Sequence, residues 1–147
     1  MRCPPNLLSS RRFLNEGEFI ENPDWNQIEA AIRELDGKSK TLVTLGADDS
    51  EALATLGASD TYMTIGGGGA GKYVVSATFD NINFYNLVDL SKPDKTEKLV
   101  VGGQEGIYPS KMCVDLLRCL LVARTFLESG KLDPLVSWEE DKSLVEV

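Results

Sequence analysis

The apolar residues of segment 22–37, NPDWNQIEAAIRELDG, recur every three or four positions, as they do on one face of a helix. The residues on this face are Trp25, Ile28, Ile32 and Leu35. The ends of the segment support the same interpretation, because Asn22 can cap a helix, Pro23 suits its first turn and Gly37 can end it. We therefore expect an amphipathic helix over this segment.

Between residues 40 and 103 the apolar positions alternate instead. Short runs rich in β-branched and apolar residues predict strands at residues 40–46, 61–65, 72–79, 84–90 and 98–103. The connections at 80–83 and 91–97 are short, and short turns join antiparallel neighbours. The longer polar stretch 47–60 is expected to be a loop or a hairpin connection.

Residues 108–130, YPSKMCVDLLRCLLVARTFLESG, return to helical spacing. Apolar residues nearly encircle this second helix, which predicts burial on most sides and an end at Gly130. A narrow polar stripe along it consists of Lys111, Asp115 and Arg118. The glycines before it are expected in a flexible strand-to-helix loop, at Gly102, Gly103 and Gly106.

The order of these elements predicts an α+β fold, with an antiparallel β-meander sheet and two main helices packed on one face. Residues 1–21 show no clear period, so we expect an N-terminal extension that includes one short strand near its RRFL segment. Residues 22–147 are expected to form a single domain. Trp138 is expected to anchor the edge of this domain.

Composition adds constraints on partners and location. The chain of 147 residues carries a formal net charge of −8, which disfavours direct contact with nucleic acid and suits a basic partner. No apolar run approaches the ~20 residues that span a bilayer, and no signal-peptide core is present, so we expect a cytoplasmic protein that avoids membranes. The sparse cysteines Cys3, Cys113 and Cys119 are expected to be small core residues rather than a disulfide framework.

The sequence contains no histidine, which removes the usual catalytic triads and the commonest metal ligand. The remaining acids, bases and nucleophiles form no recognisable catalytic constellation. The bunched carboxylates also lack the ligand order of a hard-cation site. We therefore expect a protein with no catalytic residues, no metal and no cofactor.

Residues 65–73, IGGGGAGKY, match two nucleotide-binding patterns at once. Gly66, Gly71 and Lys72 fit the phosphate-loop spacing, and Gly66, Gly68 and Gly71 fit the dinucleotide spacing. Both patterns act at the start of a helix, whereas a strand pattern follows Lys72. The glycines are therefore expected between two strands, where they supply positive φ angles. The alternative is a small phosphate- or nucleotide-binding enzyme that uses this loop, which a helix after Gly71 would favour.

Two kinds of surface are candidates for binding a partner. Acidic groups suited to a basic protein lie at Asp48, Asp49 and Glu51, in the turn at Asp80, and near the C-terminus at Glu139, Glu140 and Asp141. The exposed side of the sheet is the rival surface, since aromatic residues often dominate binding energy. Its expected residues are Tyr62, Thr64, Ser76 and Thr78.

Several segments occur in an order that resembles a known family. They are W..IEAAIRELDG, TLVTL, YMTIGGGGAGKYVVSA, LVVGGQEGIYPSKMCVD and FLESGKLDPLVSWEED. Together, over roughly residues 22–141, they resemble the first-numbered immunity-protein family of bacterial polymorphic toxin systems. The motif positions of that family correspond here to residues that we expect to define the fold rather than touch a toxin, namely Trp25, Gly66, Gly67, Gly102, Gly103, Gln104 and Trp138.

This resemblance implies an α+β binding protein that is encoded beside a toxin gene and protects the producing cell. Such a protein neutralises a cognate toxin domain, often of the nucleic-acid deaminase or nuclease type, by occlusion and without catalysis. The toxin is expected to be basic, because an enzyme that acts on nucleic acid carries a basic groove. An adaptor protein of a non-toxin complex is the remaining alternative.

Overall fold

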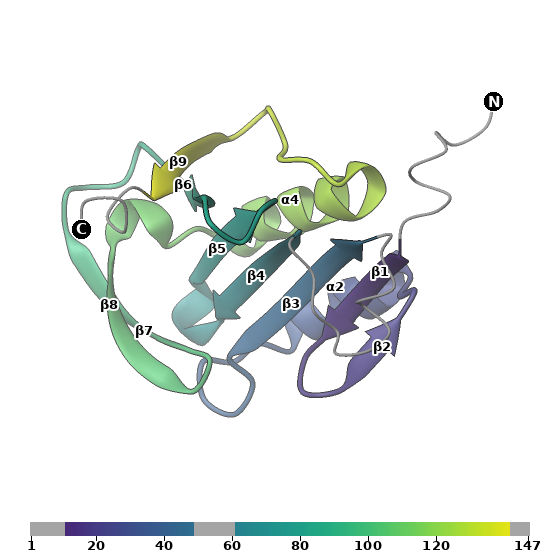
Figure 1. The fold of residues 1–147 in the computed structure, drawn as a ribbon. Coiled ribbons are helices and arrows are strands. Elements are labelled where there is room, and N and C mark those ends of the chain that lie inside the picture. Colours follow the sequence, from purple (N-terminus) through teal and green to yellow (C-terminus); the bar gives the residue numbers. More distant parts are fainter. Residues whose placement is uncertain (1–10, 49–60, 142–147) are drawn as a thin grey trace.

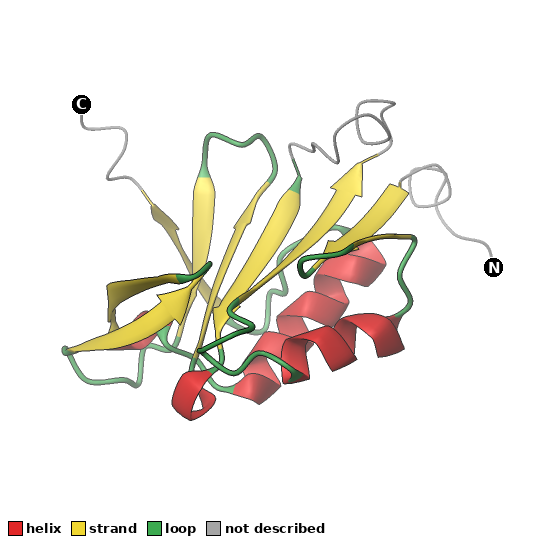
Figure 2. Ribbon diagram, turned by 90° about the horizontal axis from the view of Figure 1, so that it is seen from below, coloured by secondary structure: helices red, strands yellow, loops and turns green. Residues whose placement is uncertain are grey.

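The structure, a computed structural model, describes residues 11–48 and 61–141. Its main sheet has seven strands in the order β2-β1-β3-β4-β5-β6-β9, and each neighbouring pair is antiparallel (Figure 1). These strands are β1 (Arg11–Asn15), β2 (Phe19–Glu21), β3 (Leu42–Asp48), β4 (Tyr62–Gly67), β5 (Tyr73–Thr78), β6 (Phe84–Val88) and β9 (Ser137–Asp141). The helices α2 and α4 cover one side of this sheet (Figure 2). The α+β class and the packing of both helices on one face are confirmed.

The first two strands come from the segment that the sequence places before the domain. The strand expected at RRFL is β1, and it pairs with β2 on one side and with β3 on the other. Phe13 and Leu14 of β1 are buried. The Phe13 ring lies over Gly46, where a Cβ atom would come within 1.6 Å of the ring. Residues 11–15 and 19–21 therefore contribute two strands to the main sheet.

Helix α2 (Trp25–Arg33) is shorter than the expected helix over 22–37 and is capped differently. Asp24, rather than Asn22, is the N-cap, and its side chain accepts a hydrogen bond from the Gln27 amide at 2.8 Å. The Gln27 side chain in turn accepts one from the Asp24 amide at 3.0 Å. This capping box satisfies two amides that would otherwise lack partners. The expected apolar face is buried at Ile28, Ile32 and Leu35.

Helix α4 (Leu116–Ser129) does not begin at residue 108, as its spacing predicts. Asp115 is its N-cap and accepts a hydrogen bond from the Arg118 amide at 2.9 Å. Gly130 closes the other end with a φ of 71°, as expected. Leu117 is 75% exposed, so the expectation of burial on most sides is wrong. The helix packs on the sheet with one side and leaves the other uncovered.

The prediction of a polar stripe along this helix is also wrong. Lys111 lies before the helix, in the 3-10 turn η2 (Ser110–Met112), and its ammonium group pairs with Glu139 at 2.9 Å. Asp115 and Arg118 pair with each other at 3.0 Å at the start of the helix. The stripe cannot form because the chain ahead of α4 is a strand end, a 3-10 turn and a β-bridge rather than a helix.

The last strand expected in the meander lies outside the main sheet. β7 (Thr96–Val101) pairs with β8 (Gln104–Pro109) in a separate two-stranded hairpin, here called the arm. Gly102 and Gly103 form its two-residue turn with φ angles of 61° and 82°, and both must be positive in a turn that follows the strand twist. The expected strand-to-helix loop is therefore a hairpin turn. The edge position beside β6 is occupied by β9.

The hydrophobic core lies between the main sheet and the two helices. Its fully buried side chains include Phe126, Leu14, Ile28, Ile32, Met63, Ile65 and Leu87. Trp25 and Trp138 are partly buried and pack against this core. Cys113 and Cys119 are buried, as expected. In the part of the chain that the structure describes, neither helix is long and apolar enough to cross a membrane.

Candidate partner-binding face

The side of the main sheet away from the helices is called the open face. Residues directly opposite each other on neighbouring strands lie on one side of a sheet, so the register assigns the side chains of this face. One row across it is Gly46, Tyr62, Thr78, Phe84 and Asp141. The next row is Thr44, Thr64, Ser76, Asn86 and Glu139. The alternate positions, such as Met63 and Ala77, face the helices and are buried.

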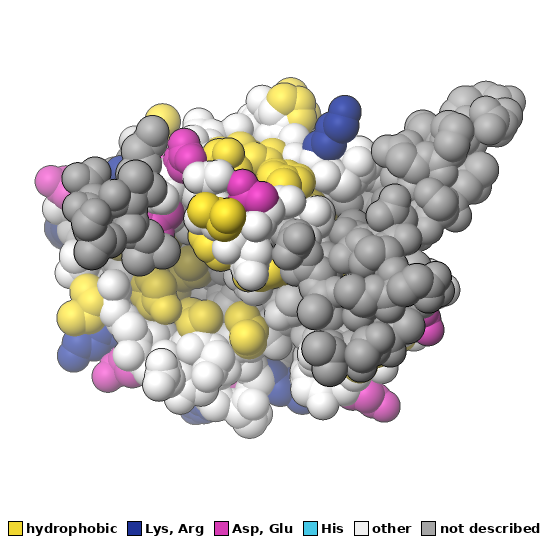
Figure 3. All heavy atoms as spheres, in the orientation of Figure 1, with side chains coloured by type: hydrophobic (Ala, Val, Ile, Leu, Met, Phe, Trp, Pro, Cys, Tyr) yellow, Lys and Arg dark blue, Asp and Glu magenta, His cyan; other side chains and the backbone are white. Residues whose placement is uncertain are grey.

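Two aromatic side chains meet on the open face. The rings of Tyr62 and Phe84 contact each other edge to face, with centroids 6.4 Å apart. The Tyr62 hydroxyl donates a hydrogen bond to Asn81 Oδ1 at 2.8 Å, which joins the pair to the β5–β6 turn (residues 79–83). Ile82 in that turn is 74% exposed. Figure 3 shows hydrophobic and acidic side chains together where this turn projects.

The β5–β6 turn is stabilised by Asp80, one of the expected acidic contacts. Its carboxylate accepts hydrogen bonds from the amides of Asn83 at 2.8 Å and Ile82 at 2.9 Å. These bonds, with the Asn83 amide foremost, lower the pKa of Asp80 from 3.8 to about 2. The carboxylate is therefore charged at neutral pH. Its contribution to stability is complete above pH 3.8 and is lost as the pH falls towards 2.

Thr78 does not offer the exposed contact that the sequence predicts. Its side chain is fully buried, and Oγ1 donates a hydrogen bond to the Asn83 carbonyl at 2.7 Å and accepts one from the Asn81 amide at 3.0 Å. Thr78 thus stabilises the β5–β6 turn through these two hydrogen bonds. Thr64 and Ser76 lie on the open face, the side of the sheet expected for them, and are half-buried there.

The C-terminal acidic residues are divided between the two sides of β9. Glu139 and Asp141 lie on the open face, whereas Glu140 is opposite Tyr85 and points to the other side. The structure therefore brings two of the three beside the aromatic pair. Asp48 is described only as the last residue of β3, and the side chains expected at Asp49 and Glu51 lie outside the described residues.

The arm packs against one end of the open face. Leu99 of β7 is buried in a second, smaller core with Val74 and Cys113. A Cβ on Gly66 would lie 2.4 Å from the Val101 side chain, so this glycine allows the arm to approach the sheet. Figure 3 shows hydrophobic side chains gathered in the hollow between the arm and the rest of this face.

The tip of the arm is joined to the glycine segment through Thr41, a residue that sequence reasoning missed. The Thr41 carbonyl accepts hydrogen bonds from the amides of Gly67 at 3.2 Å and Gly102 at 3.3 Å. Its Oγ1 accepts a third from the Gly103 amide at 2.9 Å. Gln104, the next residue, is exposed at the start of β8. The glycine motifs around residues 67 and 102 therefore meet at one buried threonine.

Replacement of Thr41 by valine is expected to lower the free energy of unfolding by about 1–2 kcal/mol, because the Gly103 amide loses its acceptor while the side-chain shape is kept. Urea unfolding followed by circular dichroism measures this loss. The matched control is Thr44→Val on the open face, which we expect to change stability by less than about 0.5 kcal/mol. Equal losses in the two variants would contradict a special role for Thr41.

The glycine segment does not form a phosphate loop. Residues Gly69–Gly71 make a single 3-10 turn, η1, and strand β5 begins at Tyr73. The Gly68 amide donates a hydrogen bond to the Lys72 carbonyl at 2.8 Å, so it is used within the chain. The Lys72 ammonium group pairs with Glu97 of the arm, and this hydrogen bond raises the pKa of Lys72. The phosphate-loop interpretation is therefore contradicted, since no helix follows the glycines.

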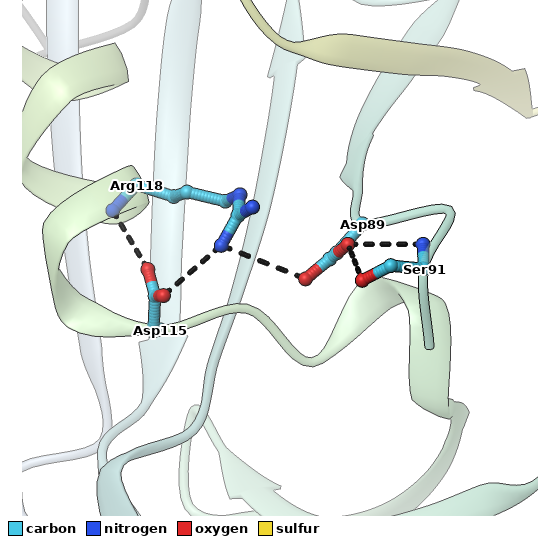
Figure 4. Close-up of polar contacts among 4 residues, drawn as sticks. All are labelled: Asp89, Ser91, Asp115 and Arg118. Carbon is cyan, nitrogen blue, oxygen red and sulfur yellow. Dashed lines mark hydrogen bonds and ion pairs between the residues drawn. The ribbon is translucent and has the colours of Figure 1, made fainter. Parts of the chain in front are cut away.

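Arg118 forms ion pairs at the junction between β6 and α4 (Figure 4). From the start of α4, its guanidinium group lies 3.0 Å from Asp115 and 3.5 Å from Asp89, which follows β6. Asp89 also accepts a hydrogen bond from the Ser91 hydroxyl at 2.6 Å, and this bond lowers the pKa of Asp89. These contacts connect the end of β6 to the first turn of α4, and so position the chain that leads into β7.

The chemical groups on the open face are suited to binding another protein. Among residues 11–48 and 61–141, no group of three or more His, Cys, Asp or Glu side chains is placed to hold a metal ion. Burial raises the pKa of the Cys113 and Cys119 thiols, which keeps both protonated at neutral pH. The open face presents aromatic rings, hydroxyl and amide groups and carboxylates, the components of a protein-binding surface.

Comparison with protein families matches residues 16–140 to the immunity protein Imm1. A comparison with curated proteins gives no match. The matched segment contains both tryptophans, both glycine motifs and the whole arm. It spans most of the chain and confirms the resemblance found in the sequence. This protein therefore belongs to the Imm1 family of immunity proteins.

Proposed function

We propose that this immunity protein neutralises a cognate toxin domain by covering the groove in which the toxin binds nucleic acid. The match to Imm1 over residues 16–140 carries the proposal, because an immunity protein has a toxin as its partner. The toxin is of the nucleic-acid deaminase or nuclease type that the sequence resemblance implies. The same match favours this function over the alternative of an adaptor protein in a complex that contains no toxin.

The charge of the chain supports a basic partner and a mechanism without catalysis. A net charge of −8 attracts a surface rich in Lys and Arg and speeds its approach. Acidic groups lie on or beside the open face, at Asp80, Glu139 and Asp141. A toxin that acts on nucleic acid needs a basic groove, and an acidic protein bound over that groove blocks the substrate by its presence alone.

Titration distinguishes occlusion from chemical inactivation of the toxin. The toxin used is the C-terminal domain of the protein encoded by the neighbouring gene, and its activity is followed on a nucleic-acid substrate. Occlusion predicts that toxin activity reaches its minimum at an equimolar amount of this protein, whatever the incubation time. Inhibition at amounts far below equimolar that deepens with time would show that the protein inactivates the toxin catalytically.

Charge reversal at Asp141, which lies on the open face opposite Phe84, is expected to slow association with the toxin about threefold to tenfold at low salt. Raising the ionic strength to about 0.5 M should shrink this difference, because salt screens the attraction. Stopped-flow binding of Asp141→Lys at two salt concentrations measures both effects. The control Glu128→Lys makes the same change in net charge on helix α4, and should slow association less. Association rates that do not depend on salt concentration would contradict electrostatic steering.

A further inference from the structure

We propose that the toxin binds the open face, centred on the Tyr62–Phe84 pair and on Ile82, and that it presents a segment bearing arginine or lysine there. This inference rests on the proposed function and specifies its surface. It also states the chemistry of the toxin segment that fits this surface, namely a cation that can pack on an aromatic ring beside carboxylates.

The exposed side chain of Ile82 has no evident part in forming its turn. The turn is already stabilised by Asp80, whose carboxylate accepts two amide hydrogen bonds, and by Thr78, which bonds to the Asn83 carbonyl. Ile82 is nevertheless 74% exposed, close to the partly exposed rings of Tyr62 and Phe84. A cluster of large apolar groups kept in water beside a polar surface is typical of the centre of a protein interface.

Carboxylates flank this apolar centre on two sides. Asp141 of β9 lies directly opposite Phe84, and Glu139, which also pairs with Lys111, occupies the next row. Asp80 lies in the turn that bears Ile82 and is ionised at neutral pH. A guanidinium group placed on the aromatic pair would therefore have acidic groups on both sides, which favours arginine over a neutral side chain.

The shape of this side of the molecule also favours the open face. The arm and the β5–β6 turn both project from it, and the surface between them is hollowed (Figures 1 and 3). The arm is held at its tip by Thr41 and along β7 by the Lys72–Glu97 ion pair and the buried Leu99, so this wall exists before the toxin binds. A preformed wall reduces the conformational entropy that binding must remove.

Helix α4 offers the strongest rival surface, because Leu117 is 75% exposed and Leu121 is 39% exposed. These leucines are one helical turn apart and lie beside the Arg124–Glu128 ion pair rather than beside a row of carboxylates. A basic toxin would approach this helix less favourably than the open face. The two surfaces lie on opposite layers of the fold, so each can be altered without touching the other (Figure 2).

The test compares Ile82→Lys with Leu117→Lys, two similar substitutions of side chains that are about equally exposed. Binding is measured by titration calorimetry with the toxin domain encoded by the neighbouring gene, after thermal unfolding shows that each variant is folded. We expect Ile82→Lys to raise Kd about 30-fold or more, because it removes a central apolar contact and repels a basic segment. Leu117→Lys should change Kd by less than about twofold.

Two further variants sharpen the result. Ile82→Glu removes the same apolar contact without repelling a cation, so it should weaken binding less than Ile82→Lys. Ser76→Arg adds bulk and positive charge in the next row of the open face and should also raise Kd. Unchanged affinity in Ile82→Lys and Ser76→Arg, or a loss confined to Leu117→Lys, would overturn the assignment of the surface. Failure of the unmodified protein to bind the toxin would instead overturn the proposed function.

Discussion

The substitution Gly68→Ala is expected to lower the free energy of unfolding by about 4 kcal/mol, because it combines backbone strain with a steric clash. Gly68 has a φ of 99°, a conformation that residues with a side chain rarely adopt. A Cβ atom there would also lie 2.4 Å from the main-chain carbon and oxygen of Leu35. Main-chain atoms cannot rotate away as a side chain can. The chain at Leu35, just after α2, would therefore have to move away from the glycine turn.

The matched control is Gly71→Ala in the same segment. Gly71 also has a positive φ, of 72°, but a Cβ there would meet no atom within 4 Å. We therefore expect a loss of only about 1 kcal/mol, the cost of the left-handed conformation alone. Urea unfolding followed by circular dichroism measures both variants. A greater loss in Gly71→Ala would contradict the structural role assigned to this segment, since the phosphate-loop pattern gives Gly71 and not Gly68 the special place.

The elements that could be predicted from the sequence are those whose signal is local. The side chains of β5 alternate between the two faces of the sheet, with Val75 and Ala77 in the core and Ser76 on the open face, and the sequence shows the same alternation. The buried face of α2 follows directly from helical spacing, and Gly130 ends α4 because a glycine tolerates the left-handed conformation. Where one segment contains enough information to select its own conformation, the prediction was correct.

The predictions that failed depend on contacts between distant segments. Strand β8 has the sequence QEGIYP, which carries little strand propensity, and it forms because the turn at Gly102 and Gly103 returns the chain along β7. The strand at RRFL was expected, but its pairing with β3 has no local signal and depends on Gly46, far along the chain, which leaves room for the Phe13 ring. The start of α2 is an exception, because its signal is local: Asn22 and Asp24 are both good caps, and the capping box with Gln27, three positions after Asp24, distinguishes them.

The candidate site was predicted only in part. Tyr62, Thr64 and Ser76 could be placed on the exposed side of the sheet because side chains alternate along a strand. Thr78 follows the same alternation, but its own turn buries it. Ile82 was missed, although an isoleucine in the polar turn DNIN is a usable signal of a functional surface. The bond between Thr41 and Gly103 joins positions 62 residues apart and has no local signal.

The substitution Asp133→Ala is expected to lower the free energy of unfolding by about 3 kcal/mol, because it removes two charge-assisted hydrogen bonds in a buried place. Asp133 is only 4% exposed, and its carboxylate accepts bonds from the Thr125 hydroxyl at 2.6 Å and the Leu135 amide at 2.8 Å. Its main-chain carbonyl also accepts a bond from Trp138 Nε1 at 3.0 Å. Asp133 therefore connects helix α4 to the segment that leads into β9.

The control Asp133→Asn keeps the shape and one acceptor oxygen, so it should lose about half as much stability as Asp133→Ala. Urea unfolding gives the stability of both variants. In the alanine variant, hydrogen exchange should be faster in β9 than in the central strands β3 and β4. This local effect is expected because Trp138 depends on the position of the Asp133 carbonyl, while the central strands depend on the main core. β9 also carries Glu139 and Asp141 of the open face. Faster opening of β9 should therefore also lower the affinity for the toxin, even under conditions where the variant remains folded. An alanine variant that opens uniformly would contradict the connecting role of Asp133.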